Sequence, residues 1–306
     1  MRTANWTDSV SVLDRVTAVF DAFGDDDHGL GVSELARRAN LPKSTVSRIA
    51  ADLVAQRFLD RDGELLHLGV RLFELGQTVP QPRMLRQLAL PVMRELQDVT
   101  AQTVQLAVLD GSDIVLIAML RAPSTGPSPA PSPARIGGRL PAHATALGKS
   151  ILAFSPPEAV TRFAAGGWER RTPHTIVEQA ALVRELADVR RTGVATEHEE
   201  CAPGTAAVAS PILVPGDAPT AAICVAGLAA ALQPDRVAAA VRAAAVTLSR
   251  RLTAERGTDA LTADRGRTDR PAQAKGHERT RRGWVRTAHP PPSCCSGQPA
   301  ISRMAS

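Results

Sequence analysis

The stretch Val32–Gln56 constrains the chain most, because its pattern predicts two short helices joined by a tight connection. Apolar residues recur at helical spacing in the first helix, where Ser33 is placed to cap and Glu34 lies in the opening turn. Asn40 tolerates the left-handed backbone that ends a helix, and Pro42 fits the first turn of a new one. We therefore predict a helix-turn-helix.

The second helix of this pair presents polar groups at its amino-terminal end. An apolar stripe follows one side of the helix and leaves hydroxyl and basic side chains on the other. Such groups reach base edges and phosphates in a major groove. An ordinary solvated helix pair has the same pattern, so the motif alone leaves both interpretations open. The candidate DNA contacts are Lys43, Ser44, Thr45, Ser47 and Arg48.

A hairpin signal follows directly after Gln56. Apolar runs flank an Asp62-Gly63 pair, which is typical of a β-hairpin. A hairpin directly after a candidate recognition helix is the wing of a winged helix. We expect Arg57 and Arg61 to contact the DNA backbone or the minor groove from there.

The length of 306 residues leaves room for two domains and a tail. No apolar run approaches the roughly 20 residues of a membrane helix, and the start does not read as a secretory signal, so we expect a cytoplasmic protein. Cys201 and Cys224 are isolated, while Cys294 and Cys295 are adjacent. This spacing fits neither a disulfide framework nor a zinc finger.

The net charge of +5 lies in the tail. Residues 255–306 carry ten basic and five acidic side chains, while the first 80 residues carry nine basic and twelve acidic ones. The overall charge is therefore no argument for DNA binding. Attraction to phosphate must come from the local placement of Lys43, Arg48, Arg57 and Arg61.

The rest of the chain mixes helical and strand patterns. We expect Pro80 and Pro82 to interrupt the chain before a helix that Pro91 kinks. Strand-like runs flank Asp110-Gly111, which predicts an antiparallel hairpin. This mixture implies the α+β class. The predicted helices are residues 9–23, 83–100, 157–165, 176–191 and one around 237–248, and the predicted strands are residues 104–109, 114–120, 194–196, 206–214 and 220–226.

Three segments lack apolar periodicity. Residues 1–8 are predicted to be disordered, and the Pro/Ser-rich run APSTGPSPAPSPA is predicted to be a surface loop. Residues 255–306, rich in Arg, Pro, Ser, Thr and Gly, are predicted to be a disordered basic tail. That tail either adds non-specific DNA affinity or has no function.

Four motifs in order give the chain a family resemblance. They are LARRANLPKSTVSRIAADLVAQRFLDRDGELLHLGVRLFELG, LPAHATALGKSILA, EHEECAPGTAAVASPI and AAICVAGLAA. With these motifs the chain resembles the isocitrate lyase regulator (IclR) family of bacterial transcription regulators, from about Ser9 to about Ala254. The resemblance implies an N-terminal winged helix-turn-helix, then a GAF-like effector-binding domain with an antiparallel sheet and flanking helices.

The resemblance also implies that successive segments of the chain have different functions. We expect a DNA-binding domain at residues 9–78, a linker and dimerisation helix at 79–101 and an effector-binding domain at 102–254. The expected protein is a homodimer or tetramer that binds a pseudo-palindromic operator in double-stranded DNA. Repressors and activators share this architecture, and we expect a repressor of a catabolic or metabolic operon.

The segment AHATALGKS is a candidate anion site, because backbone amides at a helix start hold a carboxylate without a metal. A loop that merely caps its helix is an equal alternative on the residues alone. The resemblance favours a pocket formed by this loop, by the acidic segment before Pro203-Gly204 and by two later strands. The implied effector-binding residues are Ala146, Leu147, Glu197, Thr205, Ala207, Cys224 and Ala226.

The pocket composition indicates the chemistry of the ligand. Where acid-binding relatives have serines on the last strand, this chain has Cys224 and Ala226, and Leu147 replaces a smaller residue. Fewer hydroxyls favour a more apolar ligand than a small hydrophilic acid. We expect an aromatic or aliphatic acid or a lactone.

A rival interpretation is a metal-binding or small-molecule sensor, or an enzyme, whose winged helix serves protein contacts. Residues of acid/base and metal-ligand type occur in the second half of the chain. However, no HExxH, paired CxxC or GxSxG occurs, so we expect no catalytic residue, metal or cofactor. We expect His143 to be structural and Cys201 to be a surface or half-buried residue. The residues of acid/base and metal-ligand type that leave this rival interpretation possible are His143, Lys149, Glu197, His198 and Cys201.

Overall fold

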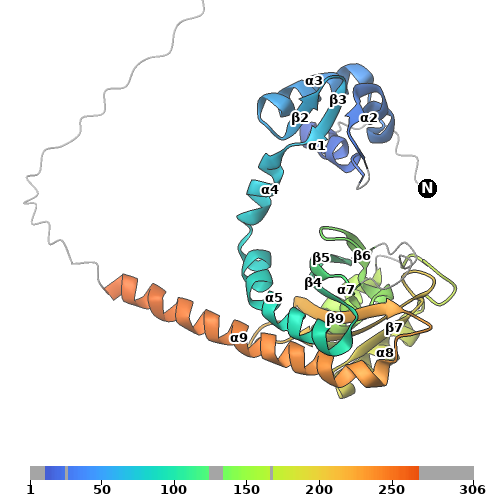
Figure 1. The fold of residues 1–306 in the computed structure, drawn as a ribbon, viewed down its shortest axis with the longest axis vertical. Helices are drawn as coiled ribbons and strands as arrows, with labels where there is room; N and C mark the ends of the chain where they lie inside the picture. Colours follow the sequence, from blue (N-terminus) through green and yellow to red (C-terminus); the bar gives the residue numbers. More distant parts are fainter. Residues whose placement is uncertain (1–10, 25–26, 124–133, 166–167, 269–306) are drawn as a thin grey trace, which may run out of the picture. The chain divides into compact units, whose positions relative to one another are not determined.

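The computed structural model describes residues 11–24, 27–123, 134–165 and 168–268 (Figure 1). The expected disordered segment 1–8, most of the Pro/Ser-rich loop and residues 269–306 lie outside this part of the chain. Within it, a helical unit with a small sheet comes first and a larger antiparallel sheet with flanking helices follows. The α+β class is confirmed.

The first unit is a winged helix. Its three-stranded antiparallel sheet has the order β1-β3-β2, and β2 pairs with β3 as the predicted wing. Its core is apolar and includes the fully buried side chains of Val19, Leu35, Val46, Leu59 and Leu66. The elements are α1 (Val12–Asp21), β1 (Leu30–Gly31), α2 (Val32–Ala39), α3 (Lys43–Ala55), β2 (Leu59–Asp62) and β3 (Leu65–Leu68).

The two ends of α2 test the cap predictions. Asn40 ends the helix with φ 53° and ψ 44°, the predicted left-handed conformation. The prediction for Ser33 is wrong, because Gly31 occupies the N-cap and no side chain caps it. The cause is β1, which was not predicted: Gly31 pairs with Leu65 in the sheet, so the helix begins at the next residue.

Two helices then carry the chain out of the winged helix: α4 (Val70–Gln77) and α5 (Pro80–Thr100). The prediction that Pro80 and Pro82 interrupt the chain before the helix is wrong, because α5 begins at Pro80. A first-turn residue needs no backbone N–H for the helix, so proline is tolerated there. Pro91 lies inside α5.

The second unit is built on a six-stranded antiparallel sheet with the order β6-β5-β4-β9-β8-β7. The two central strands, β4 and β9, come from distant parts of the chain and pair with each other, with Gln105 opposite Cys224. Its strands are β4 (Thr103–Asp110), β5 (Asp113–Leu120), β6 (Arg139–Pro141), β7 (Ala195–His198), β8 (Thr205–Ile212) and β9 (Ala221–Leu228).

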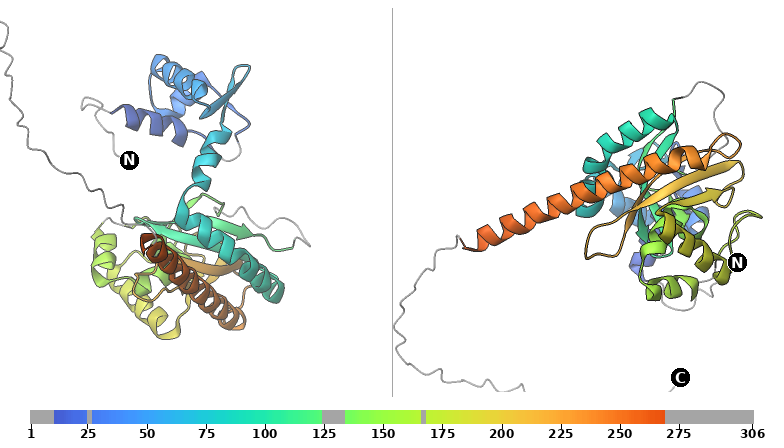
Figure 2. Two further views of the ribbon diagram at one scale, coloured as in Figure 1. Left: turned by 90° about the vertical axis from the view of Figure 1, so that its left-hand side faces the viewer. Right: turned by 90° about the horizontal axis from the view of Figure 1, so that it is seen from below.

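Helices cover both faces of this sheet (Figure 2). Alternating residues of β9 show the two faces: Ile223 and Val225 belong to one core cluster, and Ala222 and Cys224 to the other. The first cluster includes residues of α5 and α9, which lie side by side. The second includes residues of the helices on the opposite face. Along the chain after β6, the helices of both faces are η1 (Ala142–Ala144), α6 (Ala146–Phe154), α7 (Pro157–Ala165), α8 (Gln179–Thr192) and α9 (Pro234–Thr268).

The last helix is longer than the sequence analysis predicted. Disorder was expected from residue 255, but α9 continues to Thr268. A helix that is already nucleated adds further residues at little cost, so weak helix formers such as those after Ala254 extend it. None of the described helices is long and apolar enough to cross a membrane.

Candidate functional site

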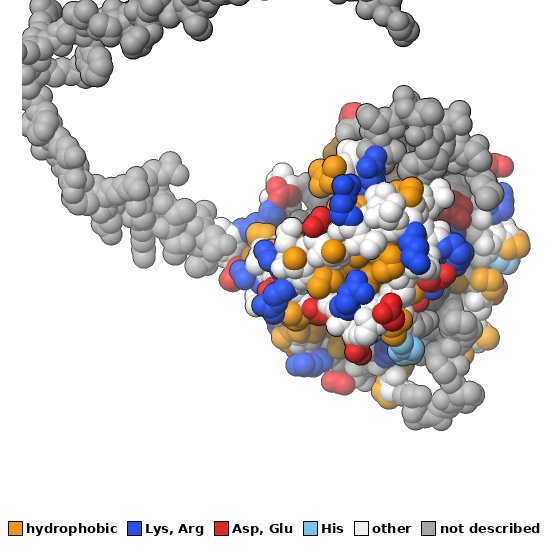
Figure 3. Space-filling view, turned by 90° about the horizontal axis from the view of Figure 1, so that it is seen from above, with side chains coloured by type: hydrophobic (Ala, Val, Ile, Leu, Met, Phe, Trp, Pro, Cys, Tyr) orange, Lys and Arg blue, Asp and Glu red, His pale blue; other side chains and the backbone are white. Residues whose placement is uncertain are grey.

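The outward face of α3 carries the predicted contact residues. Val46, Ile49, Ala50 and Leu53 are buried, which fixes the orientation of the helix. Lys43, Ser44, Ser47 and Arg48 are exposed and Thr45 is half-buried. Figure 3, which looks down on the winged helix, shows Lys and Arg side chains spread over this face among polar and apolar ones.

Arg57, just before the wing, and Arg61, in strand β2 of the wing, are both exposed. Arg57 follows α3 with φ 63°, a left-handed conformation, and its carbonyl lies so close to Gly69 that a side chain at Gly69 would overlap it. Arg71 supports the same turn, because its guanidinium lies 4.9 Å from the centre of the Phe58 ring. The backbone that carries Arg57 is therefore held from both sides.

Ion pairing divides the basic residues of the winged helix into two groups. Arg37 and Arg38 of α2 bind Glu34 at 2.7 and 2.8 Å, and Arg38 also binds Asp27 at 2.7 Å. These hydrogen bonds, first that of Arg37, lower the pKa of Glu34 to about 2. The second group forms no ion pair with another described residue and stays available for phosphate. It includes Lys43, Arg48, Arg57 and Arg61.

The seven predicted effector residues line a single cavity of about 50 Å³ in the second unit. They come from four elements: the start of α6, β7, β8 and β9. Gln105 and Thr145 also line the cavity and were not predicted. Gln105 could have been predicted as a cavity residue, since it is a polar residue inside the apolar strand β4.

The start of α6 forms one wall of this cavity. Thr145 is the N-cap, and its Oγ1 accepts a hydrogen bond from the Gly148 amide at 3.1 Å. Gly148 packs against η1 so tightly that a Cβ would overlap the Ala142 backbone. Helix geometry leaves the amides of Ala146 and Leu147 without an intrahelical acceptor. The loop thus caps its helix, and the first two residues of that helix, Ala146 and Leu147, line the cavity.

Glu197 brings an acidic group into the same cavity. Its side chain is buried, and one carboxylate oxygen accepts hydrogen bonds from the amides of Glu200 at 3.1 Å and Cys201 at 3.2 Å. Burial raises the pKa of Glu197 to about 7, and the nearby charge of Glu200 adds to the rise. Near neutral pH this carboxyl is therefore partly protonated.

Two thiols also line the cavity. Cys201 is buried, so the expectation of a surface or half-buried residue is wrong: the turn after β7 folds inward to bring its amide to Glu197. Burial raises the pKa of Cys201 to about 11 and raises that of Cys224 further. Cys224 donates its thiol hydrogen to Gln105 Oε1 at 3.6 Å. Both side chains act here as neutral, weakly polar groups.

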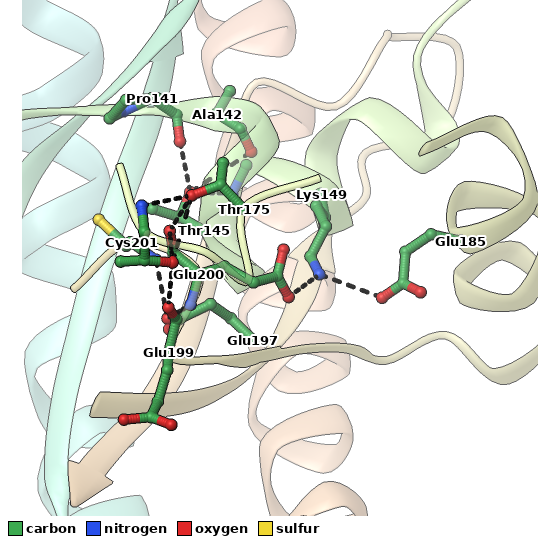
Figure 4. A network of polar contacts seen from close by, with 12 residues as sticks. Pro141, Ala142, Thr145, Lys149, Thr175, Glu185, Glu197, Glu199, Glu200 and Cys201 are labelled. Carbon is green, nitrogen blue, oxygen red and sulfur yellow. Dashed lines mark hydrogen bonds and ion pairs between the residues drawn. The ribbon is translucent and has the colours of Figure 1, made fainter. Parts of the chain in front are cut away.

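A buried ion-pair network lies next to Glu197, which lines the cavity (Figure 4). Lys149 of α6 is fully buried, and its Nζ lies 2.7 Å from Glu200 Oε1 and 3.1 Å from Glu185 Oε1 of α8. Thr175 Oγ1 donates to the Glu200 carbonyl at 2.7 Å. Burial raises the pKa of Glu200, which the positive charge of Lys149 opposes. This network ties α6 to α8 and to the turn that holds Glu197.

His143 and His198 differ in their surroundings. His143 is buried, stacks on Trp168 with ring centres 5.7 Å apart, and its Nε2 lies 3.1 Å from the Glu169 carbonyl, so the predicted structural contact is confirmed. Burial lowers its pKa, which favours the neutral form of the ring. His198 is exposed. The described residues contain no group of three or more His, Cys, Asp or Glu that could hold a metal ion.

Comparison with known proteins decides the family. Residues 12–63 match the IclR helix-turn-helix domain, and residues 77–250 match the bacterial transcriptional regulator IclR C-terminal domain. The chain belongs to the IclR family. It is therefore a transcriptional regulator with a DNA-binding helix-turn-helix and a C-terminal effector domain.

Individual IclR-family relatives agree. The chain is 33% identical to the transcriptional repressor IclR of Escherichia coli K12 over 77% of this chain and 86% of that protein. It is 31% identical to the repressor AllR of Klebsiella pneumoniae over 73% of this chain and 82% of that protein. These relatives are regulators, so the rival interpretation as a metal sensor or an enzyme is not favoured.

A solved structure agrees as well. An IclR homologue of Microbacterium hydrocarbonoxydans, in complex with 4-hydroxybenzoate, superposes with a TM-score of 0.72 and 30% identity. The superposition covers 80% of this chain and all of that chain, 100%. The two-unit architecture of the chain is thus that of a solved IclR-family regulator.

Proposed function

We propose that this chain is a repressor that binds a pseudo-palindromic operator and responds to a small organic acid. The observation that carries the proposal is the convergence of the seven implied effector residues on one cavity at the start of α6. We assign DNA binding to residues 9–78, the linker and dimerisation role to 79–101 and effector binding to 102–254. The protein acts by binding and not by catalysis.

The DNA contacts follow from exposure and charge on α3. Arg48 and the hydroxyls of Ser44 and Ser47 face outward near the amino-terminal end of α3, the part of a recognition helix that reads base edges. Lys43, Thr45, Arg57 and Arg61 complete the assigned set and supply mostly backbone contacts. Attraction to the DNA phosphates depends on these local basic side chains, because the excess of acidic residues in the winged helix gives no long-range attraction to DNA.

The protein binds its operator as a homodimer or tetramer. Support comes from apolar side chains that a single protomer leaves uncovered: Val70 and Phe73 of α4 are 53% and 66% exposed, and Leu13 of α1 is 75% exposed. No residue of α4 is buried. A second copy covers such a surface and sets two recognition helices at the spacing of operator half-sites.

The effector is an aromatic or aliphatic acid or a related lactone. Its carboxylate accepts hydrogen bonds from the amides of Ala146 and Leu147, and its apolar body packs on Leu140, Ala207 and Ala226. The solved relative from Microbacterium hydrocarbonoxydans binds 4-hydroxybenzoate, a compound of this class. The cavity of about 50 Å³ holds only a few water molecules, so an aromatic acid binds by opening it. An effector that binds the opened cavity more tightly than the closed one shifts the protein toward the opened state. This shift is how the effector changes DNA binding.

The first test is a fluorescence polarisation titration with the intergenic DNA upstream of the gene that encodes this chain. The full-length protein is titrated at two salt concentrations against that duplex and a scrambled one. The proposal predicts tight binding that discriminates the scramble at both salts. Equal, weak binding to both duplexes refutes it. A calorimetric screen then ranks acids, and a preference for glyoxylate over 4-hydroxybenzoate refutes the assignment of an apolar effector.

A further inference from the structure

A second and larger cavity lies on the other face of the six-stranded sheet. It has a volume of about 330 Å³, within the range of pockets that bind small molecules, and shares no lining residue with the cavity at α6. Ile212 of β8 and Ala221 of β9 belong to its floor and to the core cluster under α5 and α9. We call this cavity the α5–α9 groove.

Apolar side chains form the floor of the α5–α9 groove. Met84 and Leu85 come from α5, Leu252 from α9, Ile212 from the end of β8, and Val214 from the loop that follows it. Leu85, Ile212 and Leu252 are buried, and Met84 and Val214 pack against the same core cluster. A ligand that enters therefore replaces water against a surface supplied by three elements.

Two polar pairs form the rim. Gln81 Nε2 of α5 donates to Thr220 Oγ1 at 2.9 Å, and Arg256 of α9 pairs with Asp217 of the loop between β8 and β9. The side chains of that ion pair are 46% and 49% exposed. Among the described residues that line the groove, Arg256 and Asp217 are the only charged ones, and they neutralise each other.

The charge balance identifies the class of occupant. A carboxylate that takes Arg256 leaves Asp217 without its partner, and an ammonium group that takes Asp217 does the same to Arg256. A neutral hydroxyl or carbonyl head instead bonds to Gln81 or Thr220 and leaves the ion pair intact. We propose that the α5–α9 groove is a second ligand site, for a small neutral molecule with an apolar body and one hydroxyl or carbonyl group.

The site differs in chemistry from the cavity at α6, which offers two helix amides to an acid. It also touches the first turns of α5, the helix that follows directly after the winged helix and α4. The proposal rests on the groove alone and not on the proposed repressor function. A failure of operator binding would leave it standing.

Methyl NMR of the full chain labelled at the methionine methyl groups provides a local readout, because Met84 lines the groove. The signal is assigned with Met84→Leu. The probes are 4-ethylphenol, which is neutral, and 4-ethylbenzoate, which has the same body and a charge. We expect millimolar 4-ethylphenol to shift the Met84 methyl signal to saturation, and 4-ethylbenzoate to bind at least tenfold more weakly.

Two variants separate the sites. Ala218 is an exposed residue of the groove wall, so Ala218→Trp fills the groove without disturbing the core and should abolish the shift. Ala226→Phe fills the cavity at α6 and should leave the shift unchanged.

Four outcomes overturn the proposal. They are the absence of a saturable shift, a shift that survives Ala218→Trp, equal binding of 4-ethylbenzoate, and a Met84 signal that moves with protein concentration alone. The last outcome would assign the groove to a second copy of the chain.

Discussion

Lys149 Nζ lies 2.7 Å from Glu200 Oε1, and both side chains are buried near Glu197, which lines the cavity at α6. Glu200 and Glu197 belong to one turn, since the Glu197 carboxylate accepts a hydrogen bond from the Glu200 amide. The ammonium group on α6 therefore fixes the turn that carries the acidic wall of the cavity. A substitution at Lys149 should therefore change the position of Glu197, although the two side chains form no hydrogen bond with each other.

Replacing Lys149 with methionine should destabilise the protein strongly. The change leaves Glu200 and Glu185 without their cation, and removing one partner of a buried pair costs about 3 to 5 kcal/mol. Urea denaturation measures the free energy of unfolding. Arg191→Met is the matched control, because Arg191 and Asp188 form an exposed pair, 73% and 72%, worth about 1 kcal/mol or less. Equal losses in both variants would contradict the role given to Lys149.

Gly148→Ala should deform the start of α6. A Cβ at this position overlaps the backbone of Ala142, which cannot move aside as a flexible side chain does. We expect a loss of about 1 to 3 kcal/mol, typical of overpacking, together with weaker acid binding. Gly76→Ala is the control, since Gly76 lies inside α4 with open space around it and alanine is the better helix former by about 1 kcal/mol. Thermal denaturation measures the stability of both variants, and calorimetry measures how tightly each binds the acid.

Glu197 should make stability depend on pH. Burial raises its pKa in the folded protein to about 7 from an ordinary value of 4.5. Between these values the folded chain holds a proton that the unfolded chain releases, so the free energy of unfolding falls as pH rises. The contribution is complete below the unfolded pKa and is lost as pH rises through about 7. Glu197→Gln should remove up to about 3 kcal/mol of this dependence. Urea denaturation at a series of pH values measures the free energy of unfolding of both proteins. Parallel curves of this free energy against pH for wild type and Glu197→Gln would contradict the prediction.

The same carboxyl should couple acid binding to proton uptake. A bound carboxylate and an ionised Glu197 repel each other in a small cavity, so the acid binds best to the protonated form. Affinity should therefore fall as pH rises past about 7. Calorimetry in two buffers with different heats of ionisation measures the proton directly. Heats that do not depend on the buffer would exclude the coupling.

Arg48→Ala should weaken specific operator binding by about 1 to 3 kcal/mol if Arg48 reads a guanine, and it should relax specificity at that base pair. Lys43→Ala should instead weaken binding to all sequences and reduce the salt dependence by about one counterion. Arg37→Ala is the control, because Arg37 is held by Glu34 on α2. Unchanged operator affinity in Arg48→Ala would remove Arg48 from the readout.

The winged helix was predictable because its signals are local. The burial of Val46, Ile49 and Leu53 follows from their spacing alone, and Asn40 ends its helix for a reason internal to one residue. Ser33 was assigned wrongly because the competing factor is a two-residue strand, which is too short to leave a pattern. Similarly, Pro80 looks like an interruption until the helix that it begins is known.

The cavity was predictable only in part. Its residues lie on several elements, including β4, β6, α6, β7, β8 and β9, and no periodicity in the chain predicts that Gln105 and Cys224 become neighbours. The family resemblance supplied the seven implied residues, whereas the burial of Cys201 and the link from Lys149 to Glu200 required the fold. The charge of Lys149 would ordinarily predict an exposed residue, because lysine is rarely buried unless paired.

The most direct test of the account measures operator affinity by fluorescence polarisation with and without a saturating aromatic acid, in the wild-type chain and in Ala226→Phe. The account predicts that the acid changes the dissociation constant of the wild-type complex by roughly 5- to 150-fold, the usual range of allosteric coupling. The filled cavity of Ala226→Phe should abolish that response. An acid response of equal size in both proteins would contradict the claim that the cavity at α6 controls DNA binding.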